Sequence, residues 1–584
     1  MSGSRVARTD RLTTAWMLAA VLVMALGLGM RGVLPQPLWT MVHVVTLGIL
    51  SNAILQWSWY FARALLHLPP GERRSGRDNT VRILAFNVAL VVLVVGMWGA
   101  QVWATILGAT LVGLVMAWHG LALLRAARTR LASRFAVVIR YYAAAAAHLV
   151  IGATLAGFIT VAMFEGGTPS WLLNARDGLT VAHALVGVGG WVGLTMAGTL
   201  VTLGPTMLHA RLDPAAVQLA LGALPVMVVG ILGGSTAAVL DWMPGVGVGV
   251  LVATLAAAVG IGVPLVRALR ARTPSTHPSW STAAGVLWLL AGAVVVGVNA
   301  LRVPDAAALR DADLSWLPLV GAGGLLQILV GALSHLMPVV IGGGPSVLRA
   351  GIAELERFSV VRLVVRNAAL VLLAATMAVT AVAGSGSGTG TQPGSGTGTG
   401  IGRDASAMAG AGASAAQEMG ALAGPTRTLW WALVLATYVA DIALFARSGM
   451  VQARARRAQE TRADLAAAPE STDASVPTTP ADTAHTANTA NTAGSTEPEY
   501  AAASDTPGPP TARTRPAAVP ASPSTTPRSS GTPDTTAPSN TAATTAPSDT
   551  TAAAPDNADH SDSTPCTDAS TPCTDASTPC PDAS

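Results

Sequence analysis

Twelve long apolar segments constrain the fold of this chain more than any other feature of its sequence. A helix of about 20 apolar residues is long enough to cross the hydrocarbon core of a bilayer. Only 11% of the residues are charged, whereas a soluble domain carries about 25%. We therefore predict an all-α polytopic membrane protein, a bundle of twelve transmembrane helices in the lipid bilayer. The spans are expected near residues 14–34, 38–62, 81–100, 102–124, 138–164, 178–207, 216–240, 244–268, 280–301, 315–341, 359–383 and 428–448.

The distribution of arginine predicts how these spans are oriented. The chain has no lysine, so all 35 basic residues are arginine. If the N-terminus lies inside, the inner segments up to the eleventh span carry 21 arginines and the outer segments carry 6. Basic residues are enriched in cytoplasmic loops. The sequence thus predicts a multi-pass protein of the plasma membrane with both termini in the cytoplasm.

Composition divides the chain into a membrane domain and less apolar segments. Residues 1–13 are expected as a cytoplasmic N-terminus and residues 14–458 as the membrane domain. Within that domain, the Gly/Ser/Thr/Ala-rich stretch 384–427 is typical of a flexible outer loop. Residues 459–584 have too few apolar side chains to fold, which predicts a disordered C-terminal tail. The three cysteines all fall in this tail: Cys566, Cys573 and Cys580.

The second span, Trp39–Phe61, is unusually polar for a transmembrane helix. At 100° per residue, one side carries His43, Thr46, Trp57 and Ser58, and the other carries Asn52, Gln56 and Trp59. Hydrocarbon offers no hydrogen-bond partners, so both sides are expected to face protein, a cofactor or a cavity. A neutral imidazole such as that of His43 is a good ligand for haem iron or copper.

Depth in the membrane pairs His43 with a second histidine, His183. At a rise of about 1.5 Å per residue, both lie roughly 7–9 Å below the outer surface. His335 lies roughly 8–10 Å from the inner surface on the same measure. The spacing therefore predicts that His43 and His183 are the protein ligands of any metal or haem in the outer half of the bundle, and that His335 does not join them.

Glycines accompany His183 along the sixth span. Gly187, Gly190 and Leu194 lie on its side of the helix, with Gly198 close by. Small residues beside a ligand leave room for the edge of a flat macrocycle. They also allow membrane helices to pack closely without any cofactor, so both interpretations stay open.

Three further residues indicate polar sites in the inner half of the bundle. Gln327 shares one side of the tenth span with Gly331 and Pro338, which suits either a cavity or proton path or an interior helix with a kink. Asp441 is the only carboxylate deep in an apolar run, and Arg366 lies at the same estimated depth. Because buried charges in membranes are normally paired, the sequence predicts an ion pair, with a proton relay as the alternative.

Three stretches carry a resemblance to a known family: HVVTLGILSNAILQWSW, AHALVGVGGWVGLTMAGTLVTLGPT and LSHLMPVVIGGGP. With twelve spans and histidines early in spans 2 and 6, residues 14–448 resemble the haem–copper oxidase catalytic-subunit superfamily. The resemblance is greatest to its divergent relatives, including the NnrS-type membrane proteins and similar actinobacterial proteins. It implies a low-spin haem on His43 and copper or another metal on His183.

The chain departs from the oxidase pattern in two places. Oxidases follow their span 6 histidine with Pro-Glu and a tyrosine, whereas Ala184, Leu185 and Val186 stand here. Oxidases also carry His-x-His in span 10 at outer depth, where this chain has only His335 near the inner side. The resemblance therefore does not extend to a complete oxygen-reducing centre.

Together these features favour an integral membrane protein that binds haem b or copper and exchanges electrons with a partner. If it is an enzyme, it is a haem or copper oxidoreductase. The net charge of +4 is small and spread among loops, so no nucleic-acid partner is expected. Two alternatives stay open: a non-catalytic assembly or structural protein, and a secondary transporter, since transporters also commonly have twelve spans.

Overall fold

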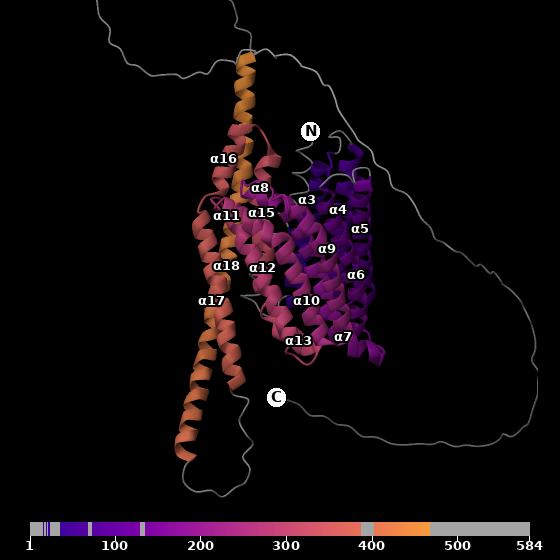
Figure 1. Ribbon diagram of the computed structural model, residues 1–584, viewed down its shortest axis with the longest axis vertical. Helices are drawn as coiled ribbons and strands as arrows, with labels where there is room; N and C mark the ends of the chain where they lie inside the picture. The colour runs from indigo at the N-terminus through magenta and orange to yellow at the C-terminus, as the bar shows by residue number, and fades with distance from the viewer. Residues whose placement is uncertain are drawn as a thin grey trace, which may run out of the picture. The chain divides into compact units, whose positions relative to one another are not determined.

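The computed structural model describes residues 16, 19, 22–23, 35–67, 73–128, 135–386 and 402–467 (Figure 1). Within them the protein is all-α, without a strand. The first helices are α2 (Pro37–His43), η1 (Val44–Ser51), α3 (Asn52–Leu65), α4 (Arg73–Trp98), α5 (Val102–Arg128), α6 (Ala136–Phe164), α7 (Ser170–Ala184), η2 (Leu185–Gly193), α8 (Leu194–Met207) and α9 (Ala216–Val239). There follow α10 (Met243–Ala257), η3 (Ala258–Gly262), α11 (Val263–Ala271), α12 (His277–Ala300), α13 (Ala306–Leu314), α14 (Leu317–Leu319), η4 (Val320–Leu326), α15 (Gln327–Ile341), α16 (Pro345–Leu355), α17 (Ser359–Gly386) and α18 (Gly402–Ala467).

Among the residues with described side chains, 11 helices are long and apolar enough to cross a membrane. They coincide with the second to twelfth predicted spans, which identifies an integral membrane protein. The first predicted span, 14–34, lies almost entirely outside the described residues, so the count of twelve stays a prediction. The cytoplasmic segment 1–13 lies outside them as well.

Four exposed tryptophans lie at one end of the helices, and a fifth, Trp280, lies near the opposite end at the start of α12. Trp98, Trp103, Trp171 and Trp242 are 42–70% exposed, and each lies at or beside a helix terminus. Because successive spans run in opposite directions, these termini all belong to the end predicted to be the outer one. Tryptophan is enriched at membrane–water interfaces, so this arrangement supports residence in a bilayer.

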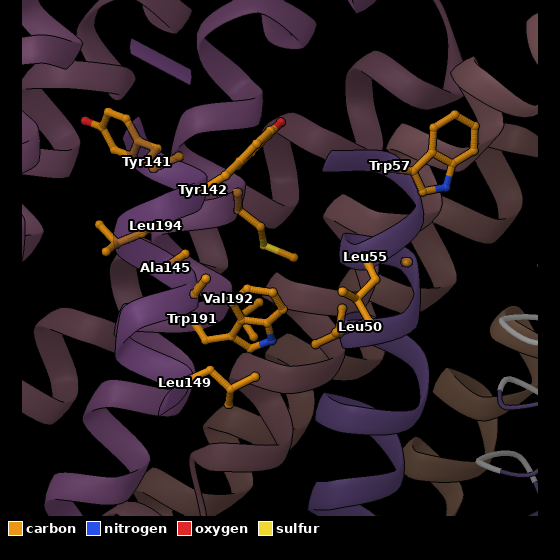
Figure 2. Packing of buried hydrophobic residues seen from close by; sticks show 14 of the residues in the cluster. Leu50, Leu55, Trp57, Tyr141, Tyr142, Ala145, Leu149, Trp191, Val192 and Leu194 are labelled. Atoms are coloured by element: carbon orange, nitrogen blue, oxygen red, sulfur yellow. The ribbon is translucent and has the colours of Figure 1, made fainter. Parts of the chain in front are cut away.

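The core nearest the predicted site is formed by the second and sixth spans packed on α6 (Figure 2). Leu50 and Leu55 come from the second span, Leu149 from α6, and Trp191 and Leu194 from the sixth. The Trp191 Nε1–H donates to Ser51 Oγ at 2.8 Å. This buried hydrogen bond fixes the register of the two spans that carry His43 and His183.

The last helix is longer than the sequence predicted. α18 begins at Gly402, inside the segment 384–427 expected to be a flexible loop, and continues to Ala467, past the predicted start of the tail at 459. Alanine has the highest helix propensity, and extending an existing helix avoids the cost of nucleation, so the alanine-rich flanks continue the spanning helix. Residues 387–401 and 468–584 lie outside the described residues. The first range contains most of the start of the predicted loop, and the second contains most of the predicted tail. The chain divides into two units, Met1–Ala474 and Ser475–Ser584.

Candidate metal site and buried ion cluster

The structure brings the imidazoles of His43 and His183 together. Their ring centroids are 6.1 Å apart and their planes are inclined by 24°. Trp39, one turn before His43, stacks on the His43 ring with a centroid separation of 4.1 Å. Both histidines are only partly buried within the protein. Two residues 140 positions apart therefore form one local site.

Hydrogen bonds fix the protonation pattern of both rings. His43 Nδ1 is 2.9 Å from the Trp39 carbonyl oxygen, and His183 Nδ1 is 2.9 Å from the Gly152 carbonyl oxygen. A carbonyl only accepts, so each Nδ1 carries the proton and each Nε2 keeps its lone pair when the ring is neutral. Histidines that bind metals usually donate their other N–H in this way, often to a backbone carbonyl.

A π-helical segment follows each histidine. His43 is the last residue of α2 and precedes η1, and His183 is the second-last residue of α7 and precedes η2. Such π segments occur frequently at functional sites. They also correct one expectation from the sequence, since a uniform 100° per residue does not hold across η1. Ser58, expected on the His43 side, instead bonds His119 Nε2 at 2.9 Å.

The two imidazoles are compatible with a single ion between them. Metal–nitrogen bonds are about 2 Å long, so two ligating nitrogens lie at most about 4 Å apart. A centroid separation of 6.1 Å allows this. No group of three or more His, Cys, Asp or Glu side chains suited to a metal occurs in the part of the chain that the structure describes. The Thr46 hydroxyl donates to the Val42 carbonyl oxygen at 2.8 Å, and thus to its own helix.

The glycines beside His183 do not all leave space for a macrocycle. A Cβ added at Gly190 would come within 2.5 Å of His148, and one at Gly198 within 2.5 Å of Tyr141 Cβ. Both glycines therefore serve close packing against α6, as the second interpretation of the sequence proposed. Only at Gly187, of these three, would a Cβ meet nothing within 4 Å. The donors that the described residues offer to either an ion or a haem are thus the two imidazoles alone, and the packing at Gly190 and Gly198 adds no support for haem.

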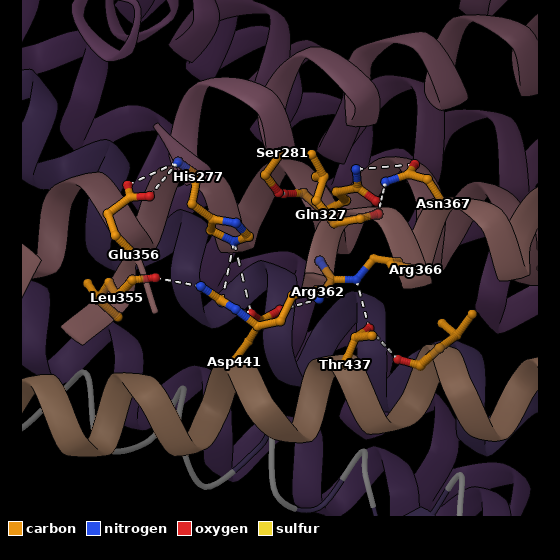
Figure 3. A network of polar contacts seen from close by, with 12 residues as sticks. His277, Ser281, Gln327, Leu355, Glu356, Arg362, Arg366, Asn367, Thr437 and Asp441 are labelled. Carbon is orange, nitrogen blue, oxygen red and sulfur yellow. Dashed lines mark hydrogen bonds and ion pairs between the residues drawn. The ribbon is translucent and has the colours of Figure 1, made fainter. Parts of the chain in front are cut away.

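A second polar region lies where α12, α17 and α18 meet (Figure 3). Arg366 contacts one carboxylate oxygen of Asp441, and Arg362 contacts the other. The three side chains are almost completely buried. His277 Nε2 lies 4.0 Å from Asp441 Oδ1, and the His277 backbone N–H donates to Glu356 at 3.0 Å. Asp441 on α18 therefore bridges two arginines of α17, and its single negative charge balances one of their two positive charges.

From the sequence, Arg362 counts only as one of the 21 inner arginines, although its spacing from Arg366 is a signal for this cluster. Arg362 and Arg366 are four residues apart on α17, so they share one helix face. Gln327, the third residue singled out in this region, lies beside the cluster (Figure 3). Its Nε2 is 3.4 Å from Asn367 Oδ1, and its backbone carbonyl accepts from Ser281 Oγ at 2.9 Å. These contacts suit an interior helix, and proton transfer along them stays a prediction.

Comparison with known proteins adds no assignment. No protein-family model matches this chain, and no curated protein matches it. The resemblance to haem–copper oxidases therefore stays a prediction.

Proposed function

We propose that this chain is a redox protein of the plasma membrane that binds copper or haem b through His43 and His183. One observation carries the proposal: two imidazoles from distant spans lie 6.1 Å apart, each with its Nδ1–H bonded to a backbone carbonyl. On this proposal the chain is a relative of the haem–copper oxidase catalytic subunit that has fewer metal ligands and no complete oxygen-reducing centre. When bound, the metal would supply one-electron transfer with a separate protein partner.

The protein's own contribution is orientation of the two ligands. The carbonyl oxygens of Trp39 and Gly152 hold the Nδ1–H tautomers, which leaves Nε2 of each ring to bind. Stacking by Trp39 restricts rotation of the His43 ring. The Trp191–Ser51 hydrogen bond keeps the two spans in register.

The test is the metal content and visible spectrum of the purified full-length protein. We expect stoichiometric copper, or a Soret band with redox-sensitive α and β bands, and loss of either signal in the His43→Ala, His183→Ala double variant. His335→Ala is the matched control, because it removes a partly buried histidine from another span. An unchanged signal in the double variant, or a wild-type protein that binds neither group after reconstitution, would contradict the proposal and favour a non-catalytic membrane protein.

A further inference from the structure

Arg82 on α4 is a buried cation without a carboxylate partner among the described residues. Its side chain belongs to a residue that is 2% exposed. Arg82 Nη2 donates to Asn79 Oδ1 at 3.0 Å, and no ion pair in the described chain includes Arg82. Asp78, one turn earlier, is exposed. Asp78 attracts the Arg82 charge but forms no ion pair with it in the described chain, whereas buried charges in membrane spans are normally paired directly.

Aromatic rings cover the Arg82 guanidinium and leave donors at its edge. Its Cζ lies 4.5 Å from the centroid of Trp59 and 5.6 Å from that of Trp118. Arg82 Nε and Trp59 Nε1 are both buried and have no hydrogen-bond partner among the described residues. Both atoms carry a hydrogen and can only donate. A group that completes this site is therefore an acceptor, and the absence of a direct ion pair to Arg82 among the described residues favours an anion.

Arg82 lies near one end of its span, close to a predicted membrane surface. It follows Arg77, the first residue of its span, by five positions, which is roughly 8 Å from the end predicted to be the inner one. Trp118 is 40% exposed, and Val81 and Leu121 beside it are similarly exposed. Because the Trp118 ring lies 5.6 Å from Arg82 Cζ, the guanidinium lies close to a side chain that reaches the protein surface.

We propose that Arg82, flanked by Trp59 and Trp118, binds a phosphate group at the inner membrane surface. The phosphate belongs to an anionic lipid headgroup or is a free phosphate ion. Phosphate oxygens accept charge-assisted hydrogen bonds from guanidinium N–H groups, and basic pockets between transmembrane helices on the cytoplasmic side bind anionic headgroups. This site uses neither His43 nor His183, so it stands independently of the proposed redox function.

The test measures the thermal midpoint of the full-length protein in neutral detergent. Dioctanoyl phosphatidylglycerol, dioctanoyl phosphatidylcholine and inorganic phosphate are titrated separately, because a ligand that binds the folded state raises this midpoint. We expect phosphatidylglycerol to raise it saturably. A similar effect of inorganic phosphate would identify a free ion as the source, and its absence would identify the lipid. An equal response to phosphatidylcholine, or no response to any ligand, would overturn the proposal.

Two variants connect the response to Arg82. Arg82→Gln should weaken the apparent affinity by about tenfold or more, since it removes a charged hydrogen-bond donor. Arg77→Gln is the matched control, an exposed arginine at the same helix end, and should respond as wild type does. If Arg82→Gln does not fold, Arg82→Lys keeps the charge and loses the planar fork, and it should still bind more weakly. An affinity equal to that of wild type in the folded Arg82 variant would overturn the proposal.

Discussion

The half of the bundle predicted to be the inner one contains two sets of buried arginines that differ in the groups that surround their charges. Arg362 and Arg366 share the carboxylate of Asp441. Arg82 has two tryptophan faces and one asparagine oxygen. The difference shows that burial of a charge alone does not define its role. An internal counter-ion makes the first cluster a connection between helices, whereas Arg82 has no ion pair among the described residues and is the residue for which we propose an external phosphate.

Removing the counter-ion of the first cluster should have the largest effect. Asp441→Asn leaves two buried guanidinium groups without a carboxylate, and breaking a buried pair costs about 3–5 kcal/mol. The unfolding free energy in detergent mixtures would measure this loss. The Asp441→Asn, Arg366→Gln double variant should be less destabilised than the sum of the single variants. Additive effects would show that the two side chains do not interact energetically.

The effect of Arg82→Gln on stability should differ between detergent and bilayers that contain anionic lipid. In detergent without anionic lipid, Arg82→Gln removes an unpaired buried charge and should leave stability unchanged or raise it slightly. In bilayers containing anionic lipid, the same change should destabilise by about 1–3 kcal/mol, the contribution of a charged hydrogen bond. Unfolding measured in both environments decides this. The comparison between the two arginine sites fails if Arg82→Gln destabilises equally in both.

A carboxylate outside the spans provides the converse case: Asp313 is a partly buried acid that forms no ion pair within the described part of the chain. Burial raises the pKa of Asp313 in α13 to about 6, and Asn299 Nδ2 donates to it at 2.8 Å. Because the folded pKa lies above the ordinary value of 3.8, the stability that the protonated acid contributes is complete below about pH 4 and is lost as the pH rises through 6. Amide hydrogen exchange in α13 should therefore be slower at pH 5 than at pH 7, after correction for the intrinsic rate. Asp313→Asn should abolish this difference, and its persistence would exclude Asp313 as the cause.

The smallest effect is expected from removing residues 475–584. This segment has too few apolar residues to contribute a folded core, and it forms a separate unit. The truncated protein should keep both the Asp441 coupling energy and the Arg82 lipid response. Size-exclusion chromatography and the two assays above would measure this. A change in either assay would show that the tail acts on the arginine sites.

The sequence predicted the positions of the spans more completely than the residues that make up the sites. The length of an apolar run follows directly from the chain, and so does the depth of a residue along its helix. Depth alone brought His43 to the level of His183, and Arg366 to that of Asp441. Rotation about the helix axis and the neighbours of each helix depend on packing, which depth does not supply. Arg82 and Arg362 therefore counted only as two of the inner arginines, although one lies between tryptophans and the other completes the Asp441 cluster.

The π-helical segment η1 changes the angular phase between the two halves of the second span. An α-helix rotates about 100° per residue, and the wider turns of η1 rotate less per residue. His43 and Ser58 therefore contact different neighbours although they belong to one continuous helix. Deleting a single residue within 44–51 would rotate the part of this span that carries His43 by a large angle about the helix axis. The imidazole of His43 would then turn away from His183, while α3 kept its contacts. The site is thus sensitive to the number of residues in a segment that contributes no ligand of its own.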